Sequence, residues 1–370
     1  MADERNLDEV RADIDAIDRE LQALLNRRAK CAQRGAEIKL ADVLAAREAG
    51  DTQAEVVYYR PEREAQVLQG IIERNEGPLP GNTVAHIFRE IMSACLALEK
   101  PLTIAYLGPE GTFTQAAVLK QFGHSVQTLA LDTLDEVFRD VAAGAADYGV
   151  VPVENSTEGV ISHTLDLFQQ SRLNICGEVE LRIHHHLLVR KEAAKVSRVL
   201  AHQQALAQCR GWLEANLPGV VHVAVGSNAE AARLARDDDS AAAIASDMAA
   251  ELYSLTIRER NIEDHPDNTT RFLVIGQQAA RSSGDDKTSL LVSVNNKPGS
   301  LYAMLKPIAE HGISMTRIES RPSRQALWEY VFYIDVNGHR DDADVAAVLA
   351  ALEQEAFAVK VLGSYPKAVI

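Results

Sequence analysis

Three clusters of polar residues stand beside apolar, β-type runs, where they could bind an anionic molecule and donate hydrogen bonds to it. GPEGTFTQAA (108–117) follows one run and opens a helical stretch, so backbone N–H groups and the hydroxyls of Thr112 and Thr114 collect at a helix N-terminus. VPVENSTEG (151–159) places polar residues at the carboxyl end of a second run, the usual ligand crevice of α/β sheets. NTTRF (268–272) precedes a third run. Taken singly, each cluster is also compatible with ordinary capping or turn chemistry.

Cations with helical spacing near the N-terminus could bind carboxylates. Arg28 and Lys39 are 11 residues apart, which is three helical turns plus about 20°, so they lie on one face of a helix. Arg11 lies 17 residues before Arg28, about 100° away around the helix axis. Arg11 can therefore share a pocket with the other two only if a second chain supplies it. A solvated charged helix face is the alternative interpretation.

The first 100 residues are expected to be helical and to position these cations. Apolar residues recur at helical spacing from residue 7 to residue 40. They include Val10, Ile14, Ile17, Leu21, Leu24 and Leu25. A helix of that length would span about 50 Å, which favours a bundle or an intertwined dimer over a lone helix. The polar stretch 41–57 is expected to end it, and two further helices are expected over 61–75 and 83–99.

The rest of the chain divides into two segments by pattern. Helical stretches and β-branched runs alternate up to about Gly276, which predicts an α/β domain. The polar stretch RSSGDDK (281–287) is expected to be a flexible linker. The last segment has the β-α-β-β-α-β order of a ferredoxin-like fold, with strands expected at 289–294, 314–321, 330–335 and 359–364 and helices at 300–311 and 341–355. The expected domains are 1–100, 101–280 and 281–370.

Composition argues against several classes of protein. The 370 residues carry a net charge of −15, which repels a polyphosphate backbone and argues against general nucleic-acid binding. No apolar run is long enough to cross a membrane as a helix, and the charged start MADERNLDEV lacks the apolar core of a signal peptide. The cysteines, Cys31, Cys95, Cys176 and Cys209, form no C-x-x-C pair, so reduced thiols in the cytoplasm are expected rather than disulfides or a zinc site.

The helical segment resembles the all-helical chorismate mutase domain. The resemblance is carried by Arg11, Arg28, Lys39, the P-E-R-E stretch (61–64) and FREIMSACLALE (88–99). It implies an intertwined dimer and a pericyclic rearrangement of chorismate to prephenate, which needs no nucleophile or metal. It also implies that Arg11 and Arg28 bind the substrate carboxylates and that Lys39 donates to the breaking ether oxygen. Arg63 and Glu64 would position the ring.

Three positions depart from the pattern of the mutase family. Glu99 stands where some members have Gln, and it would have to be protonated to donate a hydrogen bond to the ether oxygen. Cys95 stands where other members have Ser, and Arg60 where an Asp is frequent. Glu99 and Cys95 are nevertheless expected to line the mutase site.

The order of GPEGTF, VPVENSTEG and NTTRF resembles the signature of prephenate dehydratase, over about residues 103–276. The resemblance implies two α/β lobes, similar to periplasmic binding proteins, with the active site in the cleft between them. The implied reaction removes the ring hydroxyl and carboxylate of prephenate, giving phenylpyruvate, CO₂ and water without a cofactor or metal. Thr270 is implied as the oriented donor to the leaving hydroxyl, since a free Thr is a poor acid.

Further residues of the dehydratase site follow from the same resemblance. Glu154 and Asn155 are implied as catalytic polar residues, and the implied substrate contacts are Thr112, Phe113, Ser156, Thr157, Gln208 and Phe272. Arg271 either binds a substrate carboxylate or forms a structural ion pair. The consecutive histidines 184–186 are expected to be structural, because neighbouring residues of a strand face opposite sides and cannot converge on one metal ion.

The last segment resembles the ACT regulatory domain in NKPGSL (296–301) and IESRP (318–322). The resemblance implies that L-phenylalanine binds at an interface between protomers and inhibits allosterically. Gly299 would allow a ligand to reach backbone N–H groups at a turn. The implied contacts are Gly299, Ser300, Leu301, Glu319, Ser320, Arg321 and Pro322. A tight loop beside an edge strand is the structural alternative.

End to end, the chain resembles the family of bifunctional chorismate mutase–prephenate dehydratases. The implied architecture is an all-α intertwined domain, a two-lobed α/β domain and an α+β ferredoxin-like domain, in a homodimer or a dimer of dimers. The implied partners are chorismate, prephenate and the effector L-phenylalanine. Two alternatives stay open: a dehydratase whose helical domain only dimerises, and a non-enzymatic amino-acid sensor.

Overall fold

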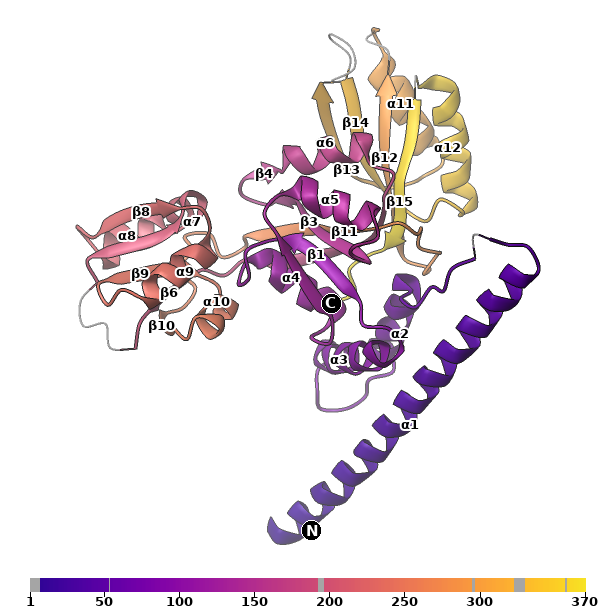
Figure 1. Ribbon diagram of the computed structural model, residues 1–370. Coiled ribbons are helices and arrows are strands. Elements are labelled where there is room, and N and C mark those ends of the chain that lie inside the picture. The colour runs from indigo at the N-terminus through magenta and orange to yellow at the C-terminus, as the bar shows by residue number, and fades with distance from the viewer. Residues whose placement is uncertain (1–6, 53, 192–195, 295–296, 323–329, 357) are drawn as a thin grey trace, which may run out of the picture. The chain divides into compact units, whose positions relative to one another are not determined.

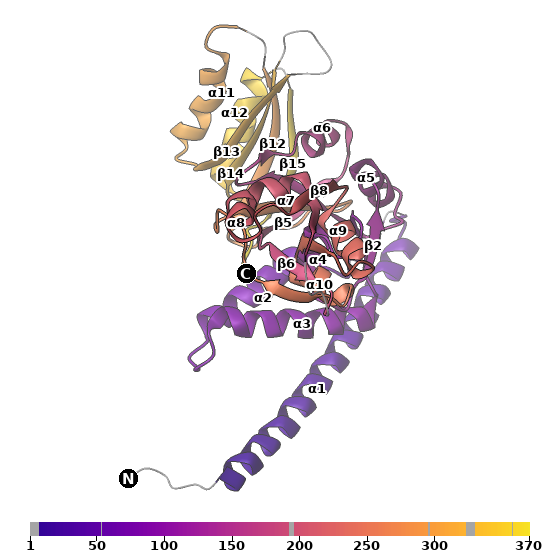
Figure 2. The same ribbon diagram turned by 90° about the vertical axis from the view of Figure 1, so that its left-hand side faces the viewer.

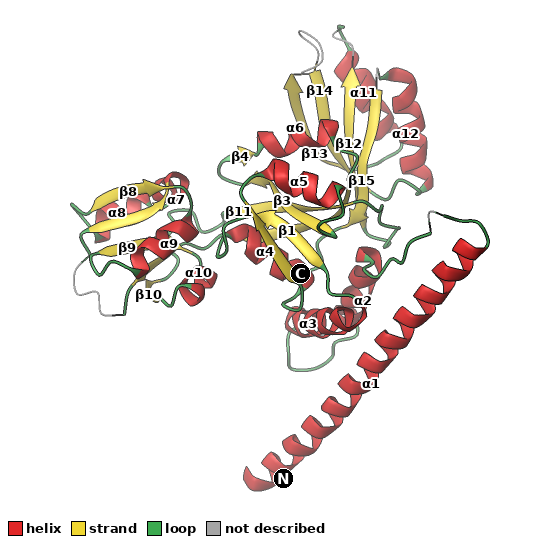
Figure 3. Cartoon of the chain, viewed as in Figure 1, coloured by secondary structure: helices red, strands yellow, loops and turns green. Residues whose placement is uncertain are grey.

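The computed structural model describes residues 7–52, 54–191, 196–294, 297–322, 330–356 and 358–370 (Figure 1). The described chain divides into two compact units. The first comprises residues up to Arg60, Gly70–Leu102 and Phe122–Val126, and the second comprises Pro61–Gln69, Thr103–Gln121 and Gln127–Ile370. All described strands belong to the second unit (Figure 3).

Helix α1 (Leu7–Glu48) carries the cations of the N-terminal segment and is 42 residues long. It continues past the end expected at Leu40, because residues 41–48 are mostly strong helix formers. The helix ends shortly before Gly50, whose φ of 103° is a conformation that favours glycine. The other helices of this segment, α2 (Pro61–Glu73) and α3 (Gly81–Glu99), lie where the sequence predicts them.

The apolar stripe of α1 is uncovered in the single chain. No residue of α1 is buried. The members of the predicted stripe are each 41–55% exposed: Val10, Ile14, Ile17, Leu21, Leu24 and Leu25. A contiguous apolar surface of this kind marks an interaction site.

The first lobe of the second unit is built on a six-stranded sheet in the order β2-β1-β3-β11-β5, with β4 paired to β3. The first three strands run parallel, whereas β11 runs antiparallel between β3 and β5. The strands are β1 (Thr103–Leu107), β2 (Gln127–Leu131), β3 (Tyr148–Asn155), β4 (Gly159–Val160), β5 (Asn174–Arg182) and β11 (Thr269–Gly276). The helices are α4 (Phe113–Phe122), α5 (Leu134–Ala142) and α6 (Ser162–Gln170).

The second lobe is a five-stranded sheet in the order β10-β6-β9-β7-β8. The chain enters it after β5 and returns from it before β11, so the domain has the two α/β lobes predicted from the sequence (Figure 1). The strands are β6 (His186–Val189), β7 (Arg198–His202), β8 (Val221–Val225), β9 (Ala241–Ala245) and β10 (Thr256–Glu259). The helices are α7 (Gln203–Gln208), α8 (Arg210–Asn216), α9 (Asn228–Arg236) and α10 (Asp247–Leu252).

The C-terminal segment has the predicted β-α-β-β-α-β order and a sheet in the order β13-β14-β12-β15. Both helices cover one face of this sheet (Figure 2). The strands are β12 (Asp286–Val294), β13 (Met315–Pro322), β14 (Tyr330–Asn337) and β15 (Ala358–Pro366). The helices are α11 (Ser300–Glu310) and α12 (Ala343–Glu355).

The C-terminal domain packs directly on the first lobe of the α/β domain. One hydrophobic core contains Phe168 of α6 together with Val331 of β14 and Leu362 of β15. In place of the expected flexible linker there is a hydrogen-bonded turn, in which the Asp286 carboxylate accepts from the backbone N–H groups of Ser283 and Gly284 over 2.9 and 3.2 Å. The chain therefore passes into β12 without a free spacer.

Candidate active sites

The mutase candidates Lys39 and Glu99 meet in the helical unit. Lys39 Nζ donates to Glu99 Oε2 over 3.0 Å and to the backbone oxygen of Tyr58 over 3.4 Å. The side chain of Glu99 is 11% exposed, and that of Lys39 is 35% exposed. The ammonium group also lies 5.9 Å from the centre of the Tyr58 ring. A half-buried ammonium held in this way is preorganised to donate to an anion or a polarised oxygen.

Arg11 does not belong to the same site within one chain. Lys39 lies 28 residues further along α1, which is about 42 Å along the helix axis. Arg28 is only 11 residues from Lys39 on the same face, about 16 Å along the axis, within the combined reach of two long side chains and a ligand. Arg28 and Lys39 can therefore reach one ligand from the same face of α1, whereas Arg11 would have to serve a different copy of the site.

The remaining mutase candidates lie on the two shorter helices. Cys95 is buried on α3 within the helical unit. Arg63 is exposed and Glu64 is half-buried in the first turn of α2. Arg60, the position that departs from the family pattern, is exposed just before that helix.

The dehydratase candidates surround a cavity of about 270 Å³ between the two lobes of the second unit. The carboxyl ends of β7, β8 and β9 reach it from one lobe, and the ends of β1 and β3 reach it from the other. Its lining includes six residues that the sequence analysis singles out: Thr112, Phe113, Thr114, Asn155, Gln208 and Thr270. Among the described lining residues there is no Lys, Arg, Asp or Glu, so the cavity is polar without a formal charge.

Asn155 and Thr270 face the cavity as a pair on neighbouring strands. Thr270 of β11 lies directly opposite Asn155 of β3 in the antiparallel ladder. Asn155 Nδ2 donates to Thr270 Oγ1 over 2.8 Å, and both residues are buried. The next pair in the ladder is Arg271 opposite Glu154. Since successive residues of a strand face opposite sides, this second pair points away from the cavity.

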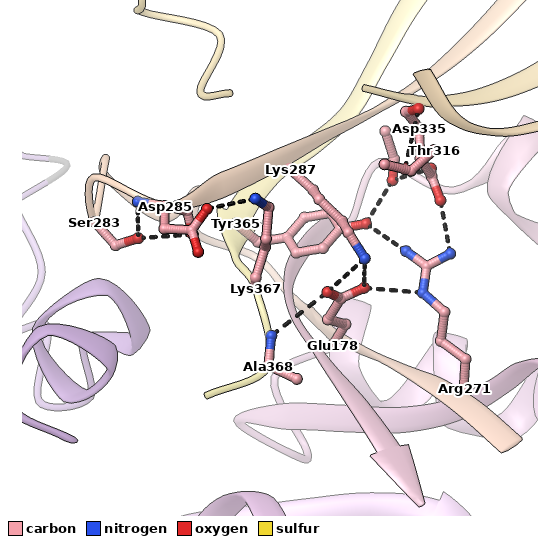
Figure 4. A network of polar contacts seen from close by, with 11 residues as sticks. Glu178, Arg271, Ser283, Asp285, Lys287, Thr316, Asp335, Tyr365, Lys367 and Ala368 are labelled. Carbon is pink, nitrogen blue, oxygen red and sulfur yellow. Dashed lines mark hydrogen bonds and ion pairs between the residues drawn. The ribbon is translucent and has the colours of Figure 1, made fainter. Parts of the chain in front are cut away.

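Arg271 is held in a buried network that joins the first lobe to the C-terminal domain (Figure 4). Its guanidinium donates to Glu178 of β5 over 2.9 Å, to Asp335 of β14 over 2.6 Å and to the Tyr365 hydroxyl of β15 over 2.9 Å. Lys287 of β12 also donates to Glu178, over 2.9 Å. These contacts favour the structural ion pair over a substrate contact for Arg271.

Electrostatics keeps the Arg271 guanidinium charged in this network. Burial by itself lowers the pKa of Arg271, but its buried neighbours Tyr365, Asp335 and Glu178 outweigh that effect. The pKa of Arg271 is therefore raised above its ordinary value.

Glu154 likewise contacts the C-terminal domain. Its carboxylate lies 3.3 Å from Arg317 Nε of β13, and Glu154 does not line the cavity. The sequence predicts a catalytic role for this residue, but the structure places it on the face of the strand pair away from Thr270. Phe272 is buried in the sheet. Ser156 accepts from the backbone N–H of Thr269 over 2.9 Å, which secures the loop rather than lining the cavity.

Several cavity residues have no counterpart among the sequence candidates. They are Ser227, Asn228 and Ser246 at the ends of β8 and β9, together with His202 and His185. Asn268 also lines the cavity; it is the first residue of the NTTRF cluster, but the sequence assigned it no role. A polar residue directly after a β-type run is the signal that indicated 151–159. The same signal occurs after β8 and β9, just before α9 and α10, so it could have identified Ser227, Asn228 and Ser246. His185 gave no such signal, because it belongs to a run of three histidines that the sequence predicts to be structural.

The candidate phenylalanine contacts divide between the two faces of β13 and the start of α11. Gly299 has a φ of 89° immediately before α11, and Leu301 is exposed. On β13, Ser320 and Pro322 are exposed, whereas Arg321 is directed at the α/β domain, with its Nε 3.2 Å from Asp166 Oδ1 of α6. Glu319 and Ser300 are half-buried. Asn296, the first residue of the NKPGSL motif, lies outside the described residues.

The described residues form neither a metal centre nor a membrane-spanning helix. In the part of the chain that the structure describes, no group of three His, Cys, Asp or Glu side chains could hold a metal ion. Within the same ranges, no helix is both long enough and apolar enough to cross a membrane.

Family models match three successive parts of the chain. The chorismate mutase type II model matches residues 10–100, the prephenate dehydratase model matches residues 104–280, and the ACT domain model matches residues 288–354. These ranges contain the Lys39 pair, the cavity and the β13 strand respectively.

Full-length relatives show the same combination, and a solved structure is similar to part of the chain. A bifunctional chorismate mutase/prephenate dehydratase of Pseudomonas aeruginosa is 54% identical over 372 residues, covering 100% of both chains. A protein of the same description from Aquifex aeolicus is 45% identical, covering 98% of this chain and 99% of the relative. A crystal structure of prephenate dehydratase in complex with L-Phe from Arthrobacter aurescens is 34% identical with a TM-score of 0.67, covering 72% of this chain and 90% of that one.

Proposed function

Because the chain belongs to the family of bifunctional chorismate mutase/prephenate dehydratases, we propose that the Lys39 site and the Thr270 cavity carry its two reactions. The helical domain rearranges chorismate to prephenate, and the two-lobed domain converts prephenate to phenylpyruvate. The observation that carries most weight is the buried Asn155–Thr270 pair, which presents a hydroxyl to a cavity of small-molecule size.

In the mutase reaction, Lys39 stabilises the charge that develops on the breaking ether oxygen. The carbon–oxygen bond breaks as a carbon–carbon bond forms, so no proton or electron has to be supplied. Glu99 accepts from Lys39 over 3.0 Å and thereby orients the ammonium group. We propose this orienting role for Glu99 in place of the protonated donor considered from the sequence. Arg28 binds a substrate carboxylate from the same helix face.

In the dehydratase reaction, Thr270 assists departure of the ring hydroxyl. The electron pair of the bond to the ring carboxylate moves into the ring as CO₂ leaves, and the carbon–oxygen bond breaks at the opposite ring position. The leaving hydroxide takes up a proton from the solvent and departs as water, while the ring becomes aromatic. The Thr270 hydroxyl donates a hydrogen bond to this oxygen as its charge develops.

The C-terminal domain is proposed to bind L-phenylalanine and to inhibit the dehydratase. The likeness to the L-Phe complex supports the ligand. The position of β13 supports the coupling, because its exposed residues alternate with Arg317 and Arg321, which pair with the α/β domain. A ligand that shifts β13 would therefore act on Glu154, the neighbour of Asn155 in β3.

A single time course tests both reactions and the proposed feedback. Purified protein given chorismate should form prephenate and then phenylpyruvate, and added L-phenylalanine should suppress phenylpyruvate at least several-fold while prephenate accumulates. Quantifying all three compounds by chromatography checks this. L-Leucine at the same concentration is the control. Unchanged phenylpyruvate formation at saturating L-phenylalanine would contradict the feedback but not the two reactions.

The proposed oligomer is a dimer in which α1 of a second copy covers the apolar stripe of α1. This arrangement is supported by the 41–55% exposure of the stripe and by the distance of Arg11 from Lys39 along the helix. An antiparallel partner helix would bring its Arg11 toward the Lys39 end of the first chain. The mutase site would then contain Arg28 and Lys39 of one chain and the arginine of the other.

A carboxylate placed in this stripe should separate the chains. Leu21→Asp is expected to give monomers by sedimentation velocity and to lower mutase kcat/KM by about 100-fold or more, because a buried unpaired charge is unfavourable and the site loses its second-chain arginine. Ala23→Asp is the matched control, since residue 23 lies about 200° around the helix from residue 21. A dimeric L21D with full mutase activity would rule out the proposed interface.

A further inference from the structure

Two backbone N–H groups determine which atom of the Asn155 amide accepts hydrogen bonds and which donates them. The N–H groups of Thr157 and Glu158 donate to Asn155 Oδ1 over 3.0 and 3.1 Å. Since a backbone N–H can only donate, this oxygen is the acceptor and the Nδ2 group is the donor. Asn155 Nδ2 therefore donates to Thr270 Oγ1 and to Asn268 Oδ1, each over 2.8 Å.

The same direction extends into the second lobe. Asn268 Oδ1 accepts, so Asn268 Nδ2 donates to Gln208 Oε1 over 3.1 Å. Gln208 Nε2 then donates to Thr157 Oγ1 over 3.0 Å, and the Thr157 hydroxyl donates to Asn155 Oδ1 over 2.6 Å. Because Gln208 Oε1 is an acceptor, His185 Nε2 at 2.8 Å from it must carry a proton.

Both ends of this series of hydrogen bonds are open. At one end, Thr270 accepts from Asn155, and its own proton has no acceptor among the described residues, so the proton is available to a molecule in the cavity. At the other end, His185 Nδ1 is buried and has no hydrogen-bond partner in the described ranges. This is the arrangement of a neutral ring protonated at Nε2.

The ring of His185 is firmly held. Its backbone N–H donates to Glu263 Oε2 over 2.9 Å, and its carbonyl accepts from the N–H of Ile262 over 2.8 Å. The ring lies edge-on to Phe113 with 5.6 Å between centres. Burial lowers the pKa of His185, and the opposing effects of Gln208 and Glu263 do not reverse this. The imidazole is therefore fixed both in place and in its neutral form.

We propose that His185 is a positioning residue of the dehydratase site. Its Nε2–H fixes the amide of Gln208, and Gln208 holds the side chains of Thr157 and Asn268. Together with the two backbone N–H groups, these side chains hold the Asn155 amide in the position and orientation that leave the Thr270 hydroxyl as a donor. The contacts between Gln208 and Thr157 cross from one lobe to the other. His185 thus links the position of the second lobe to the ability of the Thr270 hydroxyl to donate its proton to a molecule in the cavity. This inference rests on the proposed dehydratase function.

Two amide substitutions of His185 distinguish the role of its Nε2 atom from that of its Nδ1 atom. A glutamine side chain places its amide about where Nε2 lies, whereas an asparagine side chain reaches only to the position of Nδ1. In the full-length protein, His185→Gln is expected to keep the dehydratase kcat within about 3-fold of the wild type. His185→Asn is expected to lower kcat by about 10- to 100-fold with little change in KM, because the substrate still binds but the donor is misdirected.

The kinetics can also contradict the proposal. Equal kcat values in the two variants would overturn it, as would a raised KM with unchanged kcat in H185N, which would assign His185 to substrate binding. If thermal unfolding shows that H185N is not folded, Thr157→Val tests the next hydrogen bond of the series, from Gln208 to Thr157. An unchanged kcat in T157V would overturn the proposal. Wild-type protein that forms no phenylpyruvate from prephenate would instead refute the proposed function.

The tautomer supplies a readout that does not depend on activity. Histidine-selective ¹⁵N labelling with NMR should show one neutral imidazole protonated at Nε2 whose signals vanish in H185Q. An Nδ1-protonated ring at this position would reverse the first hydrogen bond of the series and overturn the proposal.

Discussion

Thr270→Ala should lower the dehydratase kcat by about 100- to 1,000-fold while KM for prephenate changes by only a few-fold. Thr270 supplies a hydrogen bond that strengthens as charge develops on the leaving oxygen, so its loss acts on the transition state more than on substrate binding. The side chain is buried and lines the cavity, and it already accepts from Asn155, which leaves its proton for the substrate. Steady-state kinetics with prephenate measures the effect.

Two control substitutions test whether the effect comes from loss of the Thr270 hydroxyl. Thr269→Ala removes the same hydroxyl from the adjacent residue of β11, which does not line the cavity, and it should stay within about 3-fold of the wild type. Thr270→Ser keeps the hydroxyl and should retain most of the activity. The mutase activity of each variant is an internal control. A T270A protein with a near-normal kcat would show that another group assists the leaving hydroxyl.

Lys39→Ala should lower mutase kcat/KM by about 100- to 1,000-fold and leave the dehydratase reaction with added prephenate unchanged. The ammonium group is the half-buried cation that Glu99 and the Tyr58 carbonyl hold in place, so its removal takes away a preorganised charge opposite the breaking ether bond. Chorismate consumption followed by absorbance measures the first effect, and phenylpyruvate formed from prephenate measures the second.

Lys30→Ala is the matched control for the mutase prediction. Lys30 is exposed on the same helix, nine residues before Lys39, about 180° away around the axis. The substitution removes the same charge from the same element and should leave both activities intact. If K39A consumed chorismate as fast as the wild type, Lys39 would have no catalytic role. If in addition the wild type consumed chorismate no faster than the uncatalysed reaction, the helical domain would serve dimerisation alone, which is the first of the alternatives left open by the sequence.

Much of the architecture follows from residue patterns. The 3–4 spacing of apolar residues predicts α1, Pro61 as a first-turn residue predicts the start of α2, and the alternation of helical and β-type runs predicts the α/β domain. The end of α1 was wrong by eight residues, because helix propensity continues through residues 41–48 although the apolar stripe weakens there.

The sequence does not predict which polar residues of β3 and β11 face the cavity and which face the C-terminal domain. Alternation predicts that Glu154 and Asn155 face opposite sides, as do Thr270 and Arg271. It does not say which side holds the cavity and which side carries the C-terminal domain. That depends on packing between segments far apart in the chain, such as the pairing of Arg271 with Asp335. His185 was missed for a related reason, since its partner Gln208 becomes visible only in the folded lobe.

The buried Arg271 network means that the C-terminal domain is not a detachable module. Truncation before β12 would leave Glu178 without Lys287 and would deprive Arg271 of Asp335 and Tyr365. Buried charges that lose a partner in this way typically cost about 3–5 kcal/mol. Cutting the gene short, as a route to a strain that overproduces L-phenylalanine, is therefore expected to give an enzyme that is less stable at the strand that carries Thr270. If L-phenylalanine binds the C-terminal domain as proposed, substitutions on the solvent face of β13 would weaken its binding and leave these buried partners in place.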